Sequence, residues 1–238
     1  LRGTVAGTED FTREGIEDGN GHGTHCAGII AARRNNVGFI GVAPKCKLLI
    51  GKVLRNSGSG SYESVAQGID WAVKKGADII SMSLGGPVTH PILHRSIHLA
   101  LAEGRTVICA AGNQGSFGTN TIGYPGRYGS VLTIAAHDPQ GNPAGFSSRG
   151  GEIDFMAPGT NIWSAYKNGG YASLSGTSMA TPFAAGMAAL ILSKHRQNQG
   201  QTPINTSEDL REHLLFMSSH PGWHDNSSGY GPIVRFSI

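Results

Sequence analysis

The sequence is poor in charge, in aromatic residues and in long hydrophobic runs. Charged residues make up 15% of the 238 residues, aromatic residues make up 7%, and the net charge is only +3. Basic residues are scattered apart from the pairs Arg33-Arg34 and Lys74-Lys75, which is not the pattern of a nucleic-acid-binding surface. Apolar runs such as 131–136 are far too short to cross a bilayer, and no basic-then-apolar leader begins the chain. We therefore expect a soluble protein without nucleic-acid or membrane partners, whose export signal, if any, lies outside this sequence.

Cysteine is also scarce. Cys26, Cys46 and Cys109 cannot all pair within the chain, so at most one disulfide can form, and their spacings match no zinc pattern. Cys26 and Cys109 stand in apolar stretches, where free and buried thiols are expected. The fold must therefore rely on its hydrophobic core, for which 39% hydrophobic residues suffice.

Glycine, in contrast, is abundant, and apolar runs alternate with amphipathic stretches. The 36 glycines indicate many tight turns or close backbone approaches. Short β-branched runs predict strands over 48–54, 78–86 and 106–113, and helical spacing predicts helices over 62–76 and 90–104. Because these strands are almost wholly apolar, we expect a parallel sheet that is covered on both faces.

The second half of the chain continues this alternation. Strands are predicted over 130–137 and 152–159, followed by a long apolar helix over 178–195. Thr206 and Asp209 resemble a capping pair before a last helix that ends near Met217, and 229–234 would form a closing turn and strand. No linker, repeat or low-complexity tract divides the chain, so we expect residues 1–238 to form one α/β domain.

Two histidines stand three residues apart in the glycine-rich stretch DGNGHGTHCAG, residues 18–28. On a helix, His22 and His25 could supply two metal ligands. However, Gly23 occupies the place of the glutamate in the metalloprotease signature, and no third ligand is nearby. Taken alone, His22 would be an ordinary loop histidine, so its meaning depends on the rest of the chain.

A candidate nucleophile lies in GTSMATP, residues 176–182. Ser178 stands where a glycine-led turn enters a helix, so backbone amides and the helix dipole would face its hydroxyl. A hydroxyl is a poor nucleophile at neutral pH, and an imidazole is the usual base that removes its proton. The alternative is that Ser178 only caps the helix.

A candidate oxyanion donor ends the apolar strand in AAGNQG, residues 110–115. The side-chain amide of Asn113 could donate a hydrogen bond to a developing negative charge. The alternative is that Asn113 only forms the turn, because asparagine tolerates the left-handed conformation.

Together, the segments HGTHCAG, SLGG, AAGN and GTSMATP resemble the subtilisin-like serine proteases, the subtilase family (peptidase family S8). The resemblance covers residues 18 to 181, and faintly 229–231. It implies a three-layer α/β fold with a mainly parallel sheet flanked by helices, and a monomeric, secreted endopeptidase that hydrolyses polypeptides through an acyl-enzyme. A sedolisin-type peptidase is the runner-up, but it would need a glutamate base in place of His22.

The resemblance also implies a role for each candidate residue. His22 would be the general base and Ser178 the nucleophile, while Asn113 and the Ser178 amide would form the oxyanion hole. His25 would then be structural, in a place suited to a supporting hydrogen bond one helical turn after His22.

Substrate-binding residues are implied in the same way. An extended peptide would add as a β-strand to an edge formed by Ser83, Leu84, Gly85 and Gly86. The S1 pocket would be walled by Ala110, Ala111, Gly112 and Gly123. Their small size would favour a large apolar or aromatic P1 residue. Tyr62 and Leu84 would line S4, which adds a second apolar preference.

Two calcium sites are implied by the resemblance. In the loop over 32–44 the ligands would be the Asn35 side chain and the carbonyls of Arg33, Val37 and Phe39, although an ordinary turn rich in asparagine and glycine is the alternative. A weaker cation site would combine Asp154 with the carbonyls of Gly129 and Val131.

The sequence does not supply the catalytic aspartate of the family. Subtilisins keep the order Asp, His, Ser, with the aspartate at the end of a buried strand. The acids before His22 all stand in polar surroundings that predict no strand; they are Glu9, Asp10, Glu14, Glu17 and Asp18. Asp10 has no apolar run before it, and Asp18 is expected to shape its own loop. The resemblance therefore predicts that the first strand or strands of the fold and the calcium aspartate also precede Leu1.

Three explanations stay open: an incomplete sequence, a cleaved protein whose N-terminal piece is lost or still bound, and a degenerate homologue. In the last case the chain would be a non-catalytic pseudoprotease that binds peptides at residues 83–86, although the retention of His22, Ser178 and Asn113 favours an enzyme. The expected partners are polypeptide substrates and an N-terminal pro-segment or missing piece. Expressed alone, the chain is expected to be poorly soluble and almost inactive, because a missing strand exposes sheet edges.

Overall fold

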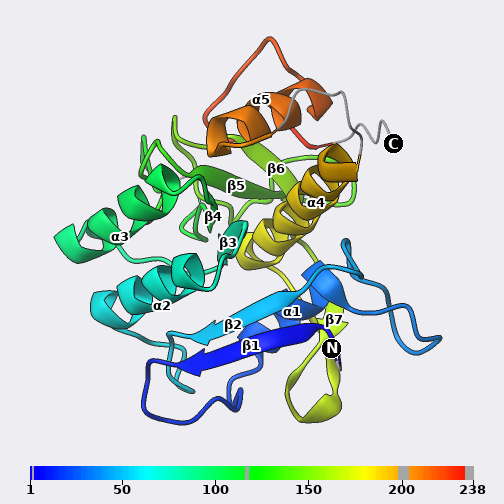
Figure 1. The fold of residues 1–238 in the computed structure, drawn as a ribbon. Helices are drawn as coiled ribbons and strands as arrows, with labels where there is room; N and C mark the ends of the chain where they lie inside the picture. The colour runs from blue at the N-terminus through cyan, green and yellow to red at the C-terminus, as the bar shows by residue number, and fades with distance from the viewer. Residues whose placement is uncertain (2, 116–117, 198–203, 234–238) are drawn as a thin grey trace.

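A parallel sheet of four strands forms the centre of the computed structural model, which describes residues 1, 3–115, 118–197 and 204–233 (Figure 1). In spatial order, the strands are β3 (Ile79–Met82), β4 (Thr106–Ala110), β5 (Leu132–His137) and β6 (Phe155–Pro158). Ile108 lies opposite Leu132, and Ile134 lies opposite Phe155. Each strand falls within a predicted range, and every residue of β4 is buried. These four predicted strands are confirmed.

Helices cover both faces of this sheet, as the three-layer prediction requires. Val107 and Cys109 of β4 pack with α2 (Tyr62–Lys74) and α3 (Pro91–Ala102). Ile108, between them, packs with α4 (Thr177–Gln197) and α5 (Ser207–Met217). Because successive strand residues face opposite sides, each face of the sheet has its own core. Figure 1 shows α2 and α3 side by side, away from α4 and α5. The predicted α/β fold class is confirmed.

The helices begin at residues that the sequence marks. A capping box of Ser61 and Ser64 precedes α2, and the predicted box of Thr206 and Asp209 precedes α5. α3 begins at Pro91. Proline suits this position because the backbone N–H groups of the first helical turn have no acceptor within the helix, so the lack of an N–H costs no hydrogen bond. Across the part of the chain that the structure describes, no helix is long and apolar enough to cross a membrane.

A second, two-stranded parallel sheet stands apart from the first and corrects one prediction. β1 (Val5–Asp10) pairs with β2 (Leu48–Lys52). We expected no strand before His22, because 5–10 lacks an apolar pattern. The strand forms through backbone hydrogen bonds to β2, which any side chain permits, and every residue of β1 is at least partly exposed. Among the described residues β2 does not pair with β3, so the expected single sheet is interrupted (Figure 1).

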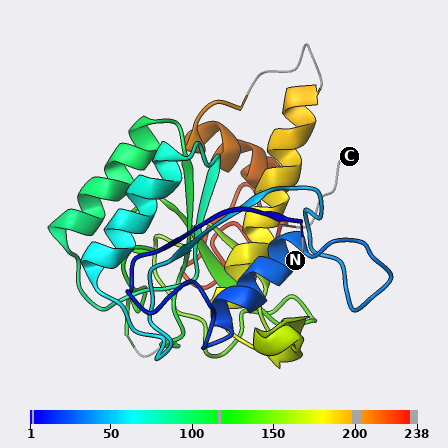
Figure 2. The same cartoon turned by 60° about the horizontal axis from the view of Figure 1, so that its bottom comes forward.

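A hairpin that the sequence did not predict supports the helix that carries the two histidines. Its strands are β7 (Ile162–Ala165) and β8 (Tyr171–Leu174), joined by the short turn η1 (Lys167–Gly169). α1 (His22–Ala31) packs closely on it: a Cβ atom at Gly28 would clash with Ser164 Oγ, and one at Gly21 would clash with the Tyr166 ring. Figure 2 shows α1 (blue) beside this hairpin (yellow-green) and α4 (yellow).

The remaining local predictions have mixed outcomes. Cys26, Cys46 and Cys109 are free; Cys109 is buried as expected, whereas Cys26 is only partly buried. In the tail, Pro232 and Ile233 form only isolated bridges, with Met156 and Ser218 respectively, rather than a strand. The last residue of the predicted closing strand, at position 234, lies outside the described residues.

Candidate active site

Asp18 holds the loop from which His22 begins α1. Asp18 Oδ1 accepts a hydrogen bond from the Gly21 amide at 2.6 Å, and Oδ2 accepts from the amide and hydroxyl of Thr24 at 2.8 and 2.7 Å. Burial raises the pKa of Asp18, but these hydrogen bonds outweigh it and keep the pKa below its usual value. The carboxylate therefore shapes the loop and forms no hydrogen bond with the imidazole among the described residues.

The surroundings of His22 favour a neutral imidazole. Burial lowers the pKa of His22 from its ordinary value of 6.5; the charge of Asp18 partly opposes this, and His25 adds to it. Within the described residues, no hydrogen bond reaches the imidazole. A neutral imidazole can accept a proton, which is what a general base must do.

His25 belongs to the contact between α1 and the hairpin. It is fully buried, and its Nε2 lies 3.0 Å from the carbonyl oxygen of Ile162 and 3.2 Å from that of Ala172, one on each strand. Because carbonyls only accept, Nε2 must carry the proton. Ser164 Oγ also donates to the His25 carbonyl at 2.8 Å. His25 thus supports His22 by fixing the helix, and not by a hydrogen bond to its imidazole.

Ser178 is the second residue of α4 and lies where α1, α4 and the end of β3 meet. Its Oγ donates to the Ser83 carbonyl at 3.4 Å, and its own carbonyl accepts from Ser83 Oγ at 2.9 Å and from Cys26 Sγ at 3.4 Å. Cys26 lies one helical turn after His22, so the same face of α1 is turned toward Ser178. Among the described residues, no backbone amide donates to Ser178 Oγ, so this oxygen does not cap α4. Among the described residues, no hydrogen bond joins Ser178 Oγ to His22.

The Cys26 thiol, which donates to the Ser178 carbonyl, is unreactive. Burial raises the pKa of Cys26 to about 12. Because the thiolate is the reactive form, the protonated Cys26 does not compete with Ser178 as a nucleophile.

Asn113 and the amide of Ser178 face one small space. Asn113 Oδ1 accepts hydrogen bonds from the amide and hydroxyl of Thr177 at 2.9 and 3.1 Å, which directs Nδ2 away from them. A Cβ atom at Gly176 would lie 3.4 Å from Asn113 Nδ2 and 3.7 Å from the Ser178 nitrogen. The left-handed conformation belongs to Gly112, with φ 108°, so Asn113 is not there to form the turn. The Asn113 side-chain nitrogen and the Ser178 amide therefore both border the turn at Gly176 that enters α4.

Residues 83–86 follow β3 and form an edge with unpaired backbone groups, which we call the docking edge. Gly86 pairs with Tyr124 through two backbone hydrogen bonds of 2.8 Å. In contrast, the backbone groups of Leu84 and Gly85 have no partner among the described residues, and Gly85 is exposed. Unpaired groups of this kind accept an additional strand.

The small residues predicted for S1 lie together but contribute differently. The Gly123 amide donates to the Ala111 carbonyl at 3.0 Å, and a Cβ atom at Gly123 would lie 3.3 Å from the Gly86 carbonyl oxygen. Ala110 and Ala111 are both buried, and the side chain of Ala111 belongs to the core. Ala111 can therefore contribute only its backbone, whereas Gly123 leaves room beside the docking edge. Gly112, with its positive φ, turns the chain between the two segments.

Tyr62, predicted for S4, stands next to the docking edge. Its hydroxyl donates to the Val88 carbonyl at 3.0 Å, and a Cβ atom at Gly86 would lie 3.0 Å from that hydroxyl. Its ring stacks on His90 with centroids 4.7 Å apart. Leu84 packs against the same core as Tyr62. The sequence analysis did not name His90, because no motif near Tyr62 or near His90 indicates that the two rings stack.

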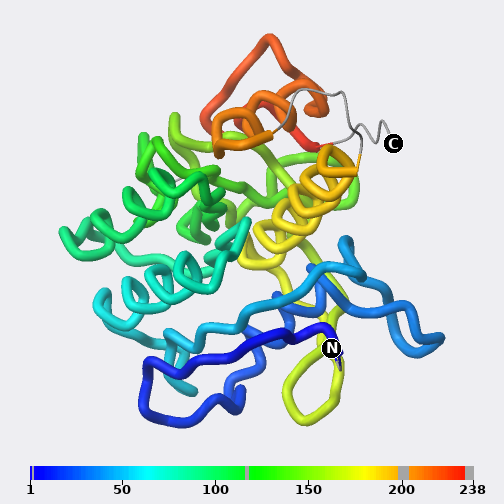
Figure 3. The backbone as a smooth tube through the Cα atoms, in the orientation of Figure 1, coloured from blue at the N-terminus to red at the C-terminus, as the bar shows by residue number. Residues whose placement is uncertain are grey.

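The loop predicted to bind calcium offers only uncharged oxygens. Asn35 Oδ1 already accepts from the Val37 amide at 3.2 Å. The other expected donors, the carbonyls of Arg33, Val37 and Phe39, belong to a loop that projects from the body of the molecule (Figure 3). Among the described residues, no group of three acidic, histidine or cysteine side chains could hold a metal. Carbonyl and amide oxygens are ligands that calcium accepts, usually together with carboxylates, so calcium binding by this loop stays a prediction.

An arginine fills the second predicted cation site. Arg211 donates to the Val131 carbonyl at 2.7 Å and to the Gly129 carbonyl at 3.4 Å, and its Nε lies 3.2 Å from Asp154 Oδ1. Burial raises the pKa of Asp154 to about 6, against the opposing effect of Arg211. The guanidinium thus satisfies the oxygens that we assigned to a cation, and the sequence could not show that α5 brings it there. We do not retain this cation site.

Asp10 lies at the end of β1, but its carboxylate oxygens already accept hydrogen bonds from the turn that follows the strand. Its Oδ1 accepts from the amide and hydroxyl of Thr12 at 2.8 and 2.6 Å, and its Oδ2 accepts from the Gly15 amide at 2.8 Å. The hydrogen bonds from Thr12 lower the pKa of Asp10. Within the described part of the chain, no carboxylate therefore forms a hydrogen bond with His22.

Comparisons with known proteins agree with this arrangement. The subtilase family matches residues 5–231. Subtilisin DY of Bacillus licheniformis is 52% identical over 206 residues, which are 86% of this chain and 73% of that protein. Subtilisin E of Bacillus subtilis (strain 168) is 45% identical over 90% of this chain, which spans 54% of that protein. Subtilisin Savinase of Lederbergia lenta is 44% identical over 83% of this chain and 70% of its own length. The chain therefore belongs to the subtilase family.

Proposed function

We propose that the protein is a serine endopeptidase that cleaves polypeptides through an acyl-enzyme. One observation carries this proposal: the side-chain nitrogen of Asn113 and the backbone nitrogen of Ser178, the proposed nucleophile, both lie within 4 Å of the point that a Cβ atom at Gly176 would occupy. Such paired donors suit the oxyanion of a tetrahedral intermediate. Membership in the subtilase family supports the same chemistry.

In the proposed mechanism, Ser178 Oγ attacks the scissile carbonyl while His22 takes its proton. The bond from Ser178 Oγ to Ser83 is long, at 3.4 Å, so little is lost when the hydroxyl turns to the imidazole. Asn113 Nδ2 and the Ser178 amide hold the oxyanion, and His22 then protonates the leaving amine. Water attacks the acyl-enzyme by the reverse route and releases the second product.

The substrate is proposed to bind as an added strand along the docking edge. The free backbone groups of Leu84 and Gly85 would pair with the peptide. The small residues near Gly123 favour a large apolar or aromatic side chain at P1, and Tyr62 with Leu84 favours an apolar one at P4. The substrates are therefore unfolded or loop segments of proteins, in keeping with a secreted enzyme.

We propose that the triad aspartate lies outside this sequence. Two observations support this: no described carboxylate bonds to His22, and the edge of β3 that faces away from β4 has no neighbouring strand in the described part. A strand there would complete the sheet and could carry an aspartate at its end. The chain alone would then be almost inactive, because loss of this aspartate costs about 10⁴-fold in turnover in a subtilisin. Robust casein hydrolysis by these 238 residues alone would overturn this proposal.

A serine-directed probe tests the peptidase proposal against a non-catalytic peptide-binding domain. The protein with its preceding segment is treated with a fluorophosphonate, and Ser178→Ala is the matched control. Labelling of the unchanged protein alone supports the enzyme. A folded, complete protein that binds peptides without labelling would support the binding domain.

A further inference from the structure

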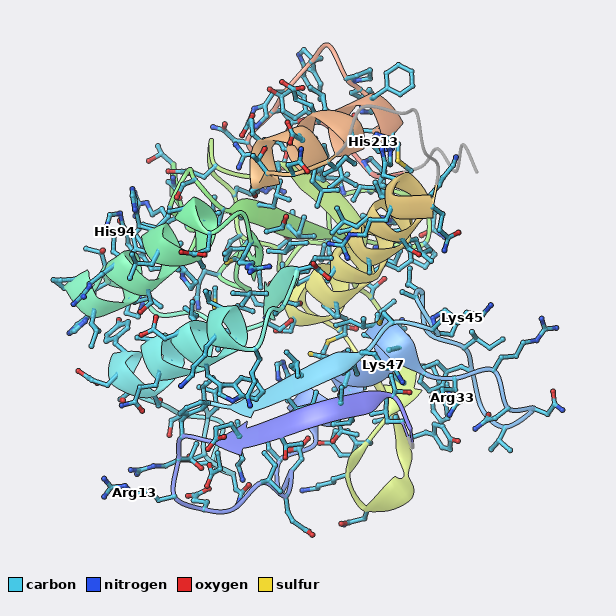
Figure 4. All side chains as sticks on the ribbon, in the orientation of Figure 1. Arg13, Arg33, Lys45, Lys47, His94 and His213 are labelled. Carbon is cyan, nitrogen blue, oxygen red and sulfur yellow. The ribbon has the colours of Figure 1, made fainter. Side chains whose placement is uncertain are left out.

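A surface depression of about 560 Å³ lies between the start of α3 and the loop that follows Gly123. Thr89 and His94 line one side, and Tyr124, Arg127 and Tyr128 line the other. Figure 4 labels His94 on α3, near the outer margin of the molecule. None of these residues has a part in the chemistry proposed above.

The walls of the depression are held in place by contacts among its own residues. The hydroxyls of Thr89 and Tyr128 are 2.7 Å apart and hydrogen-bonded. The His94 ring meets the Tyr128 ring edge-on with centroids 4.9 Å apart, and the centroid of the Tyr124 ring is also 4.9 Å from that of Tyr128. A ligand would therefore meet a preformed surface and would not need to order it.

Arg127 gives the depression a positive charge. The Arg127 guanidinium lies 5.9 Å from the centre of the Tyr124 ring, and it has no ion pair with any described carboxylate. The lining contains no aspartate or glutamate, and α3 itself has none. His94 adds a second nitrogen-bearing group. A carboxylate entering here would find an uncommitted cation and no repelling charge.

The depression lies just beyond the far end of the docking edge. Ser83, next to Ser178, is the end near the scissile bond, and Gly86 is the other end, where it pairs with Tyr124. Tyr62, at S4, donates to the carbonyl of Val88, and the next residue, Thr89, already lines the depression. At about 3.3 Å per residue, a bound strand that passes S4 needs only one or two further residues to reach it.

We propose that this depression is a distal subsite that selects an acidic side chain at the fifth or sixth residue before the scissile bond. The inference rests on the proposed peptidase function, because it assumes that peptide binds along the docking edge. Arg127 supplies the charge, and the aromatic walls with His94 orient the carboxylate.

Binding to the Ser178→Ala variant tests the subsite without any turnover. Three fluorescent octapeptides would share apolar P1 and P4 residues and carry glutamate, glutamine or lysine at both P5 and P6. We expect the glutamate peptide to bind about threefold to tenfold more tightly than the glutamine peptide at low salt, and the lysine peptide to bind more weakly than both. Arg127→Gln should remove most of this preference. Arg95→Gln, which removes an exposed charge beside His94 outside the lining, should keep it.

The outcomes separate the subsite from the peptidase proposal. Equal binding of the glutamate and glutamine peptides, or a preference that survives Arg127→Gln unchanged, overturns the subsite alone. Failure of all three peptides to bind the folded variant overturns the docking edge and the subsite together. Absence of fluorophosphonate labelling in the complete protein overturns the peptidase proposal, whatever the peptides do.

Discussion

The four-stranded sheet and the part of the molecule that carries His22 are stabilised to different degrees. β4 is buried throughout, β5 is buried in all but its last residue, and both lie between two helix layers. In contrast, β1 exposes most of its side chains, and the cluster formed by α1 and β2 has only three buried members: Ala27, Ala31 and Leu48. The proposed nucleophile and oxyanion donor extend from the first region, and the proposed base extends from the second.

The proposed catalytic groups therefore depend on two regions whose packing differs in strength. Free energy of burial grows with the apolar area removed from water, so the side of α1, β1 and β2 should open at a lower cost than the sheet. His22 is held by the packing of α1 on the hairpin and on α4, with close glycine contacts and the buried His25. Ser178 belongs to α4, which packs in the main core, and Asn113 is held by its hydrogen bonds to Thr177 of the same helix.

Removal of the oxyanion donor should have the largest effect and should leave the fold intact. Asn113→Ala is expected to lower kcat by about 10² to 10³-fold, the scale known from a subtilisin, with little change in KM. Steady-state kinetics on the complete protein measure it. Gln114→Ala, at the next exposed position, is the control and should be neutral. An unchanged kcat would mean that Asn113 does not face the oxyanion.

On the sheet side, loss of Arg211 should destabilise the whole protein. Arg211→Gln leaves the buried Asp154 without its cation, which is expected to cost about 3 kcal/mol in the free energy of unfolding. Glu208→Gln is the control, because Glu208 is 68% exposed and lies 3.8 Å from Arg211. Denaturant unfolding compares the two variants. Equal midpoints would show that the guanidinium is not needed at the site we first assigned to a cation.

On the His22 side, a single methyl group should loosen α1. Gly28→Ala places a Cβ atom against Ser164 Oγ, and the resulting overpacking is expected to cost about 1–3 kcal/mol. Gly23→Ala, on the same helix, has its nearest neighbour 3.7 Å away and should stabilise α1 by up to about 1 kcal/mol. Thermal unfolding measures both variants. A Gly28→Ala protein as stable as the unchanged one would contradict the close contact with the hairpin.

The smallest expected effect is a shift in the titration of His22. Because burial favours the uncharged form, the imidazole in this chain should titrate below 6.5, and proton uptake there should weaken folding as the pH falls through that range. A protein that also carries the triad aspartate should titrate higher, since a nearby negative charge favours the protonated form. NMR of the histidine ring protons measures both. A value above 6.5 in this chain would reveal a carboxylate partner within it.

Much of the fold could be predicted because its signals are local. The apolar runs of β3 to β6, the capping box of Thr206 and the helical spacing of α2 each depend on neighbouring residues only. The strand β1 could not be predicted, since VAGTED has no apolar pattern and pairs with the distant segment Leu48–Lys52. The hairpin of β7 and β8 was missed for a similar reason: its strands are short and partly exposed.

In the candidate site, too, local motifs could be predicted and long-range contacts could not. The motifs around His22, Asn113 and Ser178 are contiguous, so the sequence was enough to nominate them and the docking edge. It could not show that Arg211 replaces a cation beside Asp154, nor that His25 binds the hairpin.

By itself, the sequence determined the family and the chemical groups available, because these depend on residue identity and order. The tertiary structure alone decided which groups meet. Thr177 orients the amide of Asn113, Cys26 and Ser83 converge on Ser178, and Arg127 lies over Tyr124 beyond the docking edge. The reason is physical: hydrogen bonds, ion pairs and burial depend on distances between residues that are far apart in the chain, and only folding sets those distances.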